Sequence, residues 1–294
     1  MRYFFVFDIG GTEIKYGVIN HEGVLIAKDK MPSRGALGGK FILDDIVAVT
    51  KSLALVYPGE GIAISSAGVI NSNTGEVLSA TNAIVDYIGM NVIKYLESKL
   101  LMPVSVMNDV NSMALCEFHQ GAGKSASSMV ALTVGTGIGG ALILNGQLIQ
   151  GHGYSAGEFG LMCVESSDYE AIASTSSLVK AAQTQIGSHI QTGVEVFKLY
   201  DEQHPIAIQI VHRFYQNLSI GIANIAYAFN PEVIVIGGGI TGRNQFIDEL
   251  TQFVNPRLNE HLRKYTAIKA ATHKNDAGMI GAFYHFLNQY PQYK

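Results

Sequence analysis

The chain has 294 residues, of which 48% are hydrophobic, and its formal net charge at pH 7 is −4. The hydrophobic residues are dispersed, no stretch approaches the roughly 18 apolar residues of a membrane span, and no basic leader precedes the first strand, so we expect no membrane association and a cytoplasmic location. Lys and Arg form no cluster, which argues against a nucleic-acid-binding surface and favours a small polar substrate.

The length of the chain favours two lobes, because single hydrophobic cores rarely grow past about 250 to 300 residues. Its two cysteines, Cys116 and Cys163, are too few and too far apart for a disulfide framework, and neither lies in a zinc-type pair. We expect both to be buried and without a chemical role.

Strands and helices alternate in the first third of the chain, which indicates an α/β sheet. Hydrophobic periodicity and the positions of Gly and Pro predict a strand–hairpin–strand unit over 3–26, with its first strand over 3–7 and a turn at 20–23. The same signals then predict a helix over 42–56, a strand over 61–65, a helix over 90–100, a strand over 103–107 and a short helix over 110–118.

Two glycine-rich loops occur in the same context, each after an apolar strand and before a second strand. The first loop is residues 8–12 (DIGGT), and the second is residues 133–140 (TVGTGIGG), which follow a predicted strand over 129–134. The second hairpin closes at Asn145-Gly146, the strongest short-range hairpin signal. Glycine lets backbone N–H groups approach a phosphate closely. One such loop would indicate a plain turn, whereas two predict a nucleotide held by both halves of the chain.

The second loop also has the glycine spacing of the dinucleotide-binding motif, at Gly135, Gly137 and Gly140. That motif requires a helix to open directly after the glycines. Here an apolar strand over 141–144 follows instead, so we reject the dinucleotide-binding fold.

The last third of the chain contains a long helical stripe over 206–229, with Pro205 in its first turn and Pro231 beyond its end. A buried strand over 233–236 then ends in three glycines, a position that suits a ligand contact in an α/β sheet, with a loose turn as the alternative. A further helix from 277 is expected to pack back on the first lobe. We therefore assign residues 1–109 and the helix 277–294 to the N-terminal lobe, and residues 110–276 to the C-terminal lobe.

Taken together and in order, six motifs of this chain resemble those of the ROK family, which comprises sugar kinases, repressors and uncharacterised proteins. The motifs are residues 8–12, Asn108-Asp109, the loop 133–140, residues 156–160 (AGEFG), residues 230–239 (NPEVIVIGGG) and residues 276–282 (DAGMIGA). The resemblance spans the whole chain. It implies the actin-like ATPase (ribonuclease H-like) fold, with two lobes and an interlobe cleft.

The resemblance assigns ATP and Mg²⁺ to the glycine loops. It implies that the first hairpin meets the phosphates of ATP and the Mg²⁺ ion, that the second loop makes another phosphate contact, and that the glycines after 236 face adenosine. The residues concerned are Asp8 (also toward Mg²⁺), Gly10, Gly11, Thr12 and Lys15, then Gly135, Thr136 and Gly137, then Gly238 and Gly239. From the residues alone, Lys15 can equally pair with phosphate or point into water.

The sugar side departs from the family pattern. Many members carry a zinc site built from a His shortly after the Gly-Glu motif and a Cys-rich loop, but here the His position is Leu161 and the stretch 162–167 holds only Cys163. We therefore expect no zinc site. The resemblance implies a sugar-binding role for Glu170, and Glu158 in its Gly-rich bend can also accept hydrogen bonds from a polyol; solvated loop charges are the alternative for both.

Asp109 is the candidate general base, because it follows the strand over 103–107 and can offer a carboxylate to a sugar hydroxyl that Asn108 orients. The structural alternative is that Asp109 is an ordinary helix N-cap.

The resulting functional hypothesis is an ATP-dependent sugar kinase acting on a primary 6-hydroxyl. The missing zinc motif and the ending over 277–286 look most like the β-glucoside kinases of the family, whose substrates are disaccharides such as cellobiose. Glucokinase, fructokinase and N-acetylmannosamine kinase are the alternatives within the family, and the resemblance suggests a homodimer. A repressor would carry a DNA-binding segment before the first strand, where this chain has only Met1 and Arg2, and a non-catalytic sugar-sensing module would be expected to lack Asp109 or the Asp8 loop.

Overall fold

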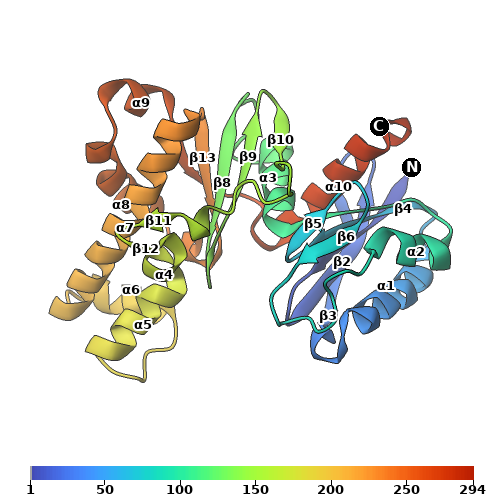
Figure 1. Ribbon diagram of the computed structural model, residues 1–294, viewed down its shortest axis with the longest axis horizontal. Helices are drawn as coiled ribbons and strands as arrows, with labels where there is room; N and C mark the ends of the chain where they lie inside the picture. Colours follow the sequence, from blue (N-terminus) through green and yellow to red (C-terminus); the bar gives the residue numbers. More distant parts are fainter. Residues whose placement is uncertain (1) are drawn as a thin grey trace. The chain divides into compact units, whose positions relative to one another are not determined.

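The computed structural model describes residues 2–294 and separates into two compact units. The first unit comprises the residues up to Gly121 together with 150–156 and 275–294, and the second comprises 122–149 and 157–274. Each unit has a five-stranded sheet with helices packed against it (Figure 1). This confirms the expected α/β class.

The sheet of the first unit has the strand order β3-β2-β1-β4-β7. Its strands are β1 (Tyr3–Ile9), β2 (Glu13–Asn20), β3 (Leu25–Pro32), β4 (Gly59–Ser66) and β7 (Val104–Asn108). The first three pair antiparallel, whereas β1, β4 and β7 are parallel. The parallel strands therefore bring their carboxyl ends to one edge of the sheet.

Helices cover both faces of this sheet. They are α1 (Gly39–Ala54) and α2 (Val92–Leu100) on one face, and α3 (Asp109–Gln120) and α10 (Ala277–Gln289) on the other. Successive strand residues point to opposite faces, so Phe4 and Phe5 serve different layers. The Phe4 ring lies 5.2 Å from that of Phe283 and 5.3 Å from that of Phe286, both in α10, while Phe5 belongs to the apolar cluster that contains Ile42 of α1.

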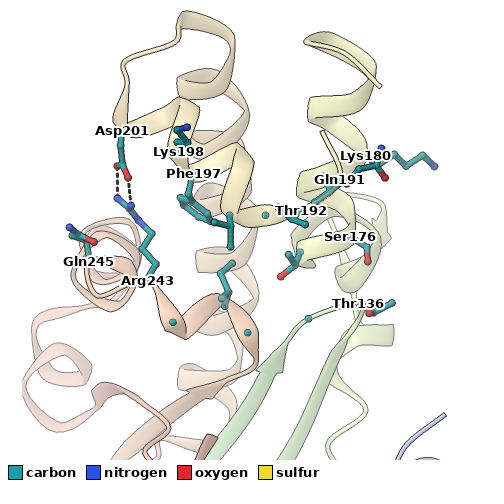
Figure 2. Close-up of a pocket in the computed structure, with 18 of the residues that line it drawn as sticks. Thr136, Ser176, Lys180, Gln191, Thr192, Phe197, Lys198, Asp201, Arg243 and Gln245 are labelled. Atoms are coloured by element: carbon teal, nitrogen blue, oxygen red, sulfur yellow. Dashed lines mark hydrogen bonds and ion pairs between the residues drawn. The ribbon is translucent and has the colours of Figure 1, made fainter. Parts of the chain in front are cut away.

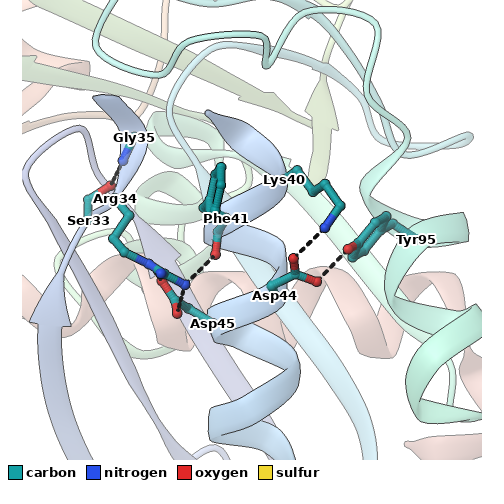
Figure 3. Close-up of polar contacts among 8 residues, drawn as sticks. All are labelled: Ser33, Arg34, Gly35, Lys40, Phe41, Asp44, Asp45 and Tyr95. Carbon is teal, nitrogen blue, oxygen red and sulfur yellow. Dashed lines mark hydrogen bonds and ion pairs between the residues drawn. The ribbon is translucent and has the colours of Figure 1, made fainter. Parts of the chain in front are cut away.

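Polar contacts join α1 to its surroundings (Figure 3). The Tyr95 hydroxyl of α2 donates to Asp44 Oδ1 at 2.5 Å, and Lys40 Nζ lies 2.7 Å from Asp44 Oδ2. Arg34, before the helix, donates to both carboxylate oxygens of Asp45. Exposed ion pairs contribute only about 0 to 1 kcal/mol each, so the stability of the unit depends mainly on the buried aromatic and aliphatic layers.

The sheet of the second unit has the order β10-β9-β8-β13-β14. Its strands are β8 (Met129–Val134), β9 (Ile138–Leu144), β10 (Gln147–Ile149), β13 (Val233–Gly237) and β14 (Ala267–Ala270). Two antiparallel pairings are again followed by two parallel ones. The two sheets thus repeat one plan, as the paired hairpins in the sequence predicted.

The expected long helix is confirmed as α7 (Pro205–Phe229), with Pro205 in its first turn and Asn230 as its left-handed C-cap. Apolar residues of α7 and α8 form one buried cluster with β8 and β13. The other helices of this unit are α4 (Tyr169–Ala173), α5 (Thr175–Gln185), α6 (Gly193–Asp201), α8 (Phe246–Val254) and α9 (Glu260–Tyr265). The short strands of the chain are β5 (Val69–Asn71), β6 (Glu76–Ser79), β11 (Cys163–Val164) and β12 (Ser167–Asp168).

The boundary between the units lies later than the expected position at residue 109. Helix α3 belongs to the first unit because it packs along α10. At Gly281 of α10 the two helices approach so closely that a Cβ would overlap the backbone of Ser112. The segment 150–156 also belongs to the first unit: Ser72 Oγ donates to Gln150 Oε1 at 2.8 Å.

The cysteines differ from each other. Cys116 is buried in α3, and burial raises the pKa of its thiol. Cys163 is exposed, so the expectation that it is buried was wrong. Its strand β11 is short and alternates, with Val164 turned inward and Cys163 outward. Among residues 2–294, no helix combines the length and apolar character needed to cross a membrane.

Candidate active site

In the first unit, predicted site residues gather where the parallel strands end. Asp8 of β1 lies opposite Ser65 of β4, and Asn108 ends β7 beside Ser66. Asp8 Oδ1 accepts a hydrogen bond from Ser65 Oγ at 2.7 Å, and Asp8 Oδ2 lies 3.2 Å from Lys15 Nζ. Lys15 therefore pairs with the Asp8 carboxylate in this structure. The sequence alone had left open whether Lys15 contacts a phosphate or points into water.

The first glycine loop is a tight connection between β1 and β2. Gly10 N donates to Glu13 O at 3.0 Å, and Thr12 O accepts from Ser33 N at 2.9 Å. A Cβ on Gly11 would lie 2.8 Å from the Ala83 side chain, so the loop packs against its neighbour without room for a larger residue. Thr12 is exposed. The loop thus offers an exposed hydroxyl and closely approachable backbone beside Asp8.

Gly278 explains part of the motif at 276–282. A Cβ at this position would lie 2.6 Å from Asp8 Oδ1, so glycine allows the start of α10 to lie against the Asp8 carboxylate. Sequence reasoning assigned no contact to Gly278 or Ser65. For Ser65 the available signal was its position near the end of the strand next to the Asp8 strand.

Asn108 and Asp109 form the start of α3, and Asn108, not Asp109, is its N-cap. Asn108 Oδ1 accepts from the N–H groups of Val110 at 2.9 Å and Asn111 at 3.0 Å, while Nδ2 donates to Gly68 O at 2.9 Å and Asp109 Oδ1 at 3.0 Å. These bonds occupy the two donors and two acceptor positions of the amide. Asn108 therefore caps α3 and also bonds to Asp109, whose Oδ1 shares the N–H of Val110 at 2.9 Å.

In the second unit, the second glycine loop is held by α5. Gly135 N donates to Gly137 O at 3.0 Å, and Gly135 O accepts from Thr175 N at 2.9 Å. Helix α5 thus begins beside the loop in space, although it does not follow the loop in the sequence. Thr175 and its neighbour Ser176 were not predicted as site residues, because no short motif links them to the loop.

A cavity of about 1350 Å³ opens beside this loop (Figure 2). Its lining includes Gly135 and Thr136 from the loop, Gly239 after β13, and side chains from α5 and α6. A Cβ added at Gly135 or Gly239 would meet open space. Gly137 and Gly238 are not among the lining residues; Gly238 instead has φ +97° and packs against the backbone of Val134. The structure thus brings three of the five predicted glycine-loop residues of this unit to one cavity.

Glu158 and Glu170 lie near each other in the second unit. Burial raises the pKa of Glu158, and the negative charge of Glu170 raises it further. Glu170 Oε2 accepts from Ile138 N at 3.2 Å and lies against Gly137, where a Cβ would clash with it. The pair offers carboxylate oxygens for hydroxyl groups, and Glu170 also supports the glycine loop. Leu161, at the position of the family's zinc-binding His, is 62% exposed.

Known proteins are similar to this chain in sequence and in fold. The family model described as ROK family matches residues 5–289. A β-glucoside kinase from Listeria innocua is 37% identical over 298 residues, covering 96% of this chain and 97% of the relative, and a glucokinase from Halalkalibacterium halodurans is 29% identical over 310 residues, covering 95% and 93%. The structure of a ROK glucokinase from Streptomyces griseus with glucose and AMPPNP superposes with a TM-score of 0.80 at 24% identity, covering 95% of this chain and 97% of that one. With the repeated sheet order, these matches confirm the actin-like ATPase fold.

Proposed function

Because the chain belongs to the ROK family, we propose that it is an ATP-dependent sugar kinase that phosphorylates the 6-hydroxyl of a hexose or of a β-glucoside such as cellobiose. The observation that carries the proposal is the cavity of the second unit, whose lining combines the second glycine loop with Gly239. Glycine loops provide backbone N–H groups for phosphates, and a cavity beside such a loop has room for the nucleoside.

The β-glucoside as acceptor is supported by the relatives. The chain is 37% identical to a β-glucoside kinase and 29% identical to a glucokinase, each over nearly the full length. Leu161 is consistent with this assignment, because the side chain at the position of the zinc-binding His is apolar and exposed.

Asp109 is the proposed general base. Phosphoryl transfer requires a carboxylate that takes the proton of the attacking sugar hydroxyl while other groups hold the phosphates in line. Asn108 orients Asp109 through the 3.0 Å bond to Oδ1. In our proposal Asn108 also lies beside the sugar, where a hydroxyl would replace one of the hydrogen bonds that its amide makes here.

The phosphate side is proposed to involve both glycine loops, with Asp8, Gly10, Gly11, Thr12 and Lys15 in the first unit and Gly135, Thr136, Gly137, Gly238 and Gly239 in the second. Lys15 can exchange its ion pair with Asp8 for a contact with a phosphate oxygen, since Lys15 Nζ lies 3.2 Å from Asp8 Oδ2 and both side chains are partly exposed.

Asp8 is suited to bind the Mg²⁺ of the ATP complex, because hard cations prefer carboxylate oxygens and the ordered Ser65 bond fixes the orientation of its carboxylate. When bound, Mg²⁺ neutralises charge on the phosphates. Lys15 then balances the remaining phosphate charge in the same region.

Glu158 and Glu170 are proposed to accept hydrogen bonds from sugar hydroxyls. Burial raises the pKa of Glu158, and the negative charge of Glu170 raises it further. Hydroxyl donors that approach the pair would stabilise both carboxylates, so sugar binding relieves the repulsion between them.

We further propose a cytoplasmic homodimer. Light scattering distinguishes the dimer from the 31.7 kDa single chain.

A coupled assay of ADP release with glucose, cellobiose, gentiobiose, fructose and N-acetylmannosamine tests the function. The highest kcat/KM is expected for cellobiose or gentiobiose. A preference for a monosaccharide would replace the β-glucoside assignment with the corresponding alternative. Absence of ADP with every sugar would contradict the kinase proposal and favour a non-catalytic sugar-sensing regulator.

A further inference from the structure

Arg243 connects two walls of the cavity in the second unit. It follows the turn 239–242, which carries Gly239 into the cavity, and its guanidinium reaches across to α6 (Figure 2). Arg243 Nη1 lies 2.6 Å from Asp201 Oδ2 and Nη2 lies 2.9 Å from Asp201 Oδ1. This two-point pairing fixes the orientation of the guanidinium as well as its distance from α6.

A second carboxylate, that of Glu249, pairs with the same guanidinium. Arg243 Nη2 donates to Glu249 Oε1 at 2.7 Å, and the Tyr215 hydroxyl of α7 donates to Glu249 Oε2 at 2.7 Å. Burial disfavours the charge of Arg243, but hydrogen bonds and charges from Glu249 and Asp201 outweigh it and raise its pKa. The side chain of Arg243 is only 14% exposed and that of Glu249 21%, whereas Asp201 is 52% exposed, so the pair with Glu249 is the shielded part of the network and the pair with Asp201 lies at the surface.

Aromatic rings of α6 complete the contact. The guanidinium carbon lies 5.1 Å from the ring centroid of Phe197 and 5.8 Å from that of Tyr200. Phe197 itself lines the cavity. Arg243 therefore contacts both the acidic end and the aromatic side of α6. A planar guanidinium suits these contacts better than the ammonium group of lysine, because it stacks on aromatic rings and pairs with a carboxylate at two points.

Hydrogen bonds within residues 238–243 connect Arg243 to the glycines after β13. Arg243 N donates to Ile240 O at 3.2 Å, and Thr241 Oγ1 donates to Gly238 O at 2.9 Å. The turn that presents Gly239 and Ile240 to the cavity is thus closed at both ends. A shift of the guanidinium would move this turn relative to Phe197.

We propose that Arg243 is a positioning residue for nucleotide binding: by linking α6 to the turn after β13, it fixes the separation between Phe197 and Gly239 and so sets the affinity of the cavity for ATP. The inference rests on the proposed kinase function, which assigns the cavity to the nucleotide. It adds a residue that lies outside the glycine loops and acts through the cavity walls.

The test combines calorimetric titration of AMPPNP with steady-state kinetics. For Arg243→Met we expect the AMPPNP Kd and the ATP KM to rise by about tenfold, while kcat and the sugar KM stay within about twofold, because only ground-state binding of the nucleotide is weakened. For Arg243→Lys and Asp201→Asn we expect rises of about threefold, because each loses the two-point pairing but keeps part of the contact. Arg263→Met, an arginine of α9 in the same unit, is the matched control and should leave all four quantities unchanged.

The possible outcomes distinguish failure of the proposed role of Arg243 from failure of the assignment of the cavity to ATP. An unchanged AMPPNP Kd in a cooperatively folded Arg243→Met variant overturns the role of Arg243, as does an equal loss of sugar affinity, which would indicate general damage to the unit. If the methionine variant does not fold, Arg243→Lys and Asp201→Asn carry the test under the same criteria. Failure of the wild-type protein to bind AMPPNP would refute the assignment of the cavity to ATP, and with it both proposals.

Discussion

The carboxylate of Glu170 accepts a hydrogen bond from the backbone N–H of Ile138, with 3.2 Å between Oε2 and N. This bond ties the short helix α4 to the strand that leaves the second glycine loop. The missing side chains of Gly137 and Gly160 make room for the carboxylate. A residue proposed for the sugar therefore also supports the backbone proposed for the phosphates.

Substitution of Glu170 separates these two contributions. In Glu170→Gln the side-chain oxygen can still accept from Ile138, so the ATP KM should stay within about twofold while loss of the charge raises the sugar KM. Glu170→Ala leaves the Ile138 N–H without this acceptor, which costs about 1 to 3 kcal/mol when the group is buried, so the ATP KM should rise at least about fivefold. Steady-state kinetics with each substrate varied measures both effects. Glu260→Ala, at an exposed position of α9 in the same unit and outside the cavity lining, is the control. An unchanged ATP KM in Glu170→Ala would refute the loop-supporting role.

Asp109→Asn is expected to abolish sugar phosphorylation with AMPPNP binding retained. The substitution keeps an Oδ1 acceptor for Asn108 and Val110, and the cap of α3 is supplied by Asn108, so the local structure should persist. Loss of a positioned general base typically lowers the rate by about 10² to 10⁴-fold. Turnover by initial rates and nucleotide binding by calorimetry are the two measurements.

A variant that kept more than about a tenth of the wild-type kcat would rule out Asp109 as the base. Asp29→Asn, at an exposed carboxylate on β3 of the same unit, should leave kcat unchanged and serves as the control.

His285 predicts a pH dependence of stability. Burial in α10 lowers its pKa from 6.5 to about 4, so the native state keeps it neutral where the unfolded chain binds a proton. Its contribution to the free energy of unfolding is therefore complete above pH 6.5 and is lost as the pH falls toward 4, by up to about 1.4 kcal/mol per pH unit. Urea unfolding of the wild type and His285→Gln between pH 7 and 4.5 should show the wild type losing about 2 kcal/mol more than the variant.

His261→Gln, at an exposed histidine of α9, is the control for this titration and should follow the wild-type curve. Parallel pH profiles for the wild type and His285→Gln would show that the protonation of His285 is not linked to unfolding.

Gly281→Ala tests the close approach of α10 and α3. The added Cβ would overlap the carbonyl of Ser112, and overpacking of this kind costs about 1 to 3 kcal/mol or more. Urea unfolding should show this loss. At Gly153 in the same unit, a Cβ meets open space and no left-handed φ is required. Gly153→Ala should therefore be neutral or slightly stabilising, since alanine reduces the entropy of the unfolded chain. Equal stability of the two variants would contradict the helix contact.

Local sequence signals predicted much of the fold. Alternation and turn residues located both hairpins, and Pro205 and Pro231 delimited α7. The helices α4, α5, α6, α8 and α9 were not predicted, although α5 and α6 line the cavity. Two of them do have local signals, a capping box of Thr192 and Glu195 at the start of α6 and apolar residues at helical spacing (246, 250 and 254) in α8. The position of α5 and α6 beside the cavity, however, is set by packing on distant parts of the chain. The exposure of Cys163 was missed for a related reason, because its two-residue strand is too short to show an alternating pattern.

The sequence by itself determined the α/β class, the repeated hairpin plan and the residues of the glycine loops, because hydrophobic period and glycine position act over a few residues. Only the tertiary structure decided how the side chains are used. Asn108 became the cap that orients Asp109, Lys15 paired with Asp8, and Glu170 reached the backbone of the second loop. The cavity wall held by Arg243 likewise joins segments about forty residues apart, and its partner Asp201 is identified by distance in space. Such contacts arise when the sheets and helices have packed, since hydrogen bonds and ion pairs require angstrom-scale positions that no local pattern encodes.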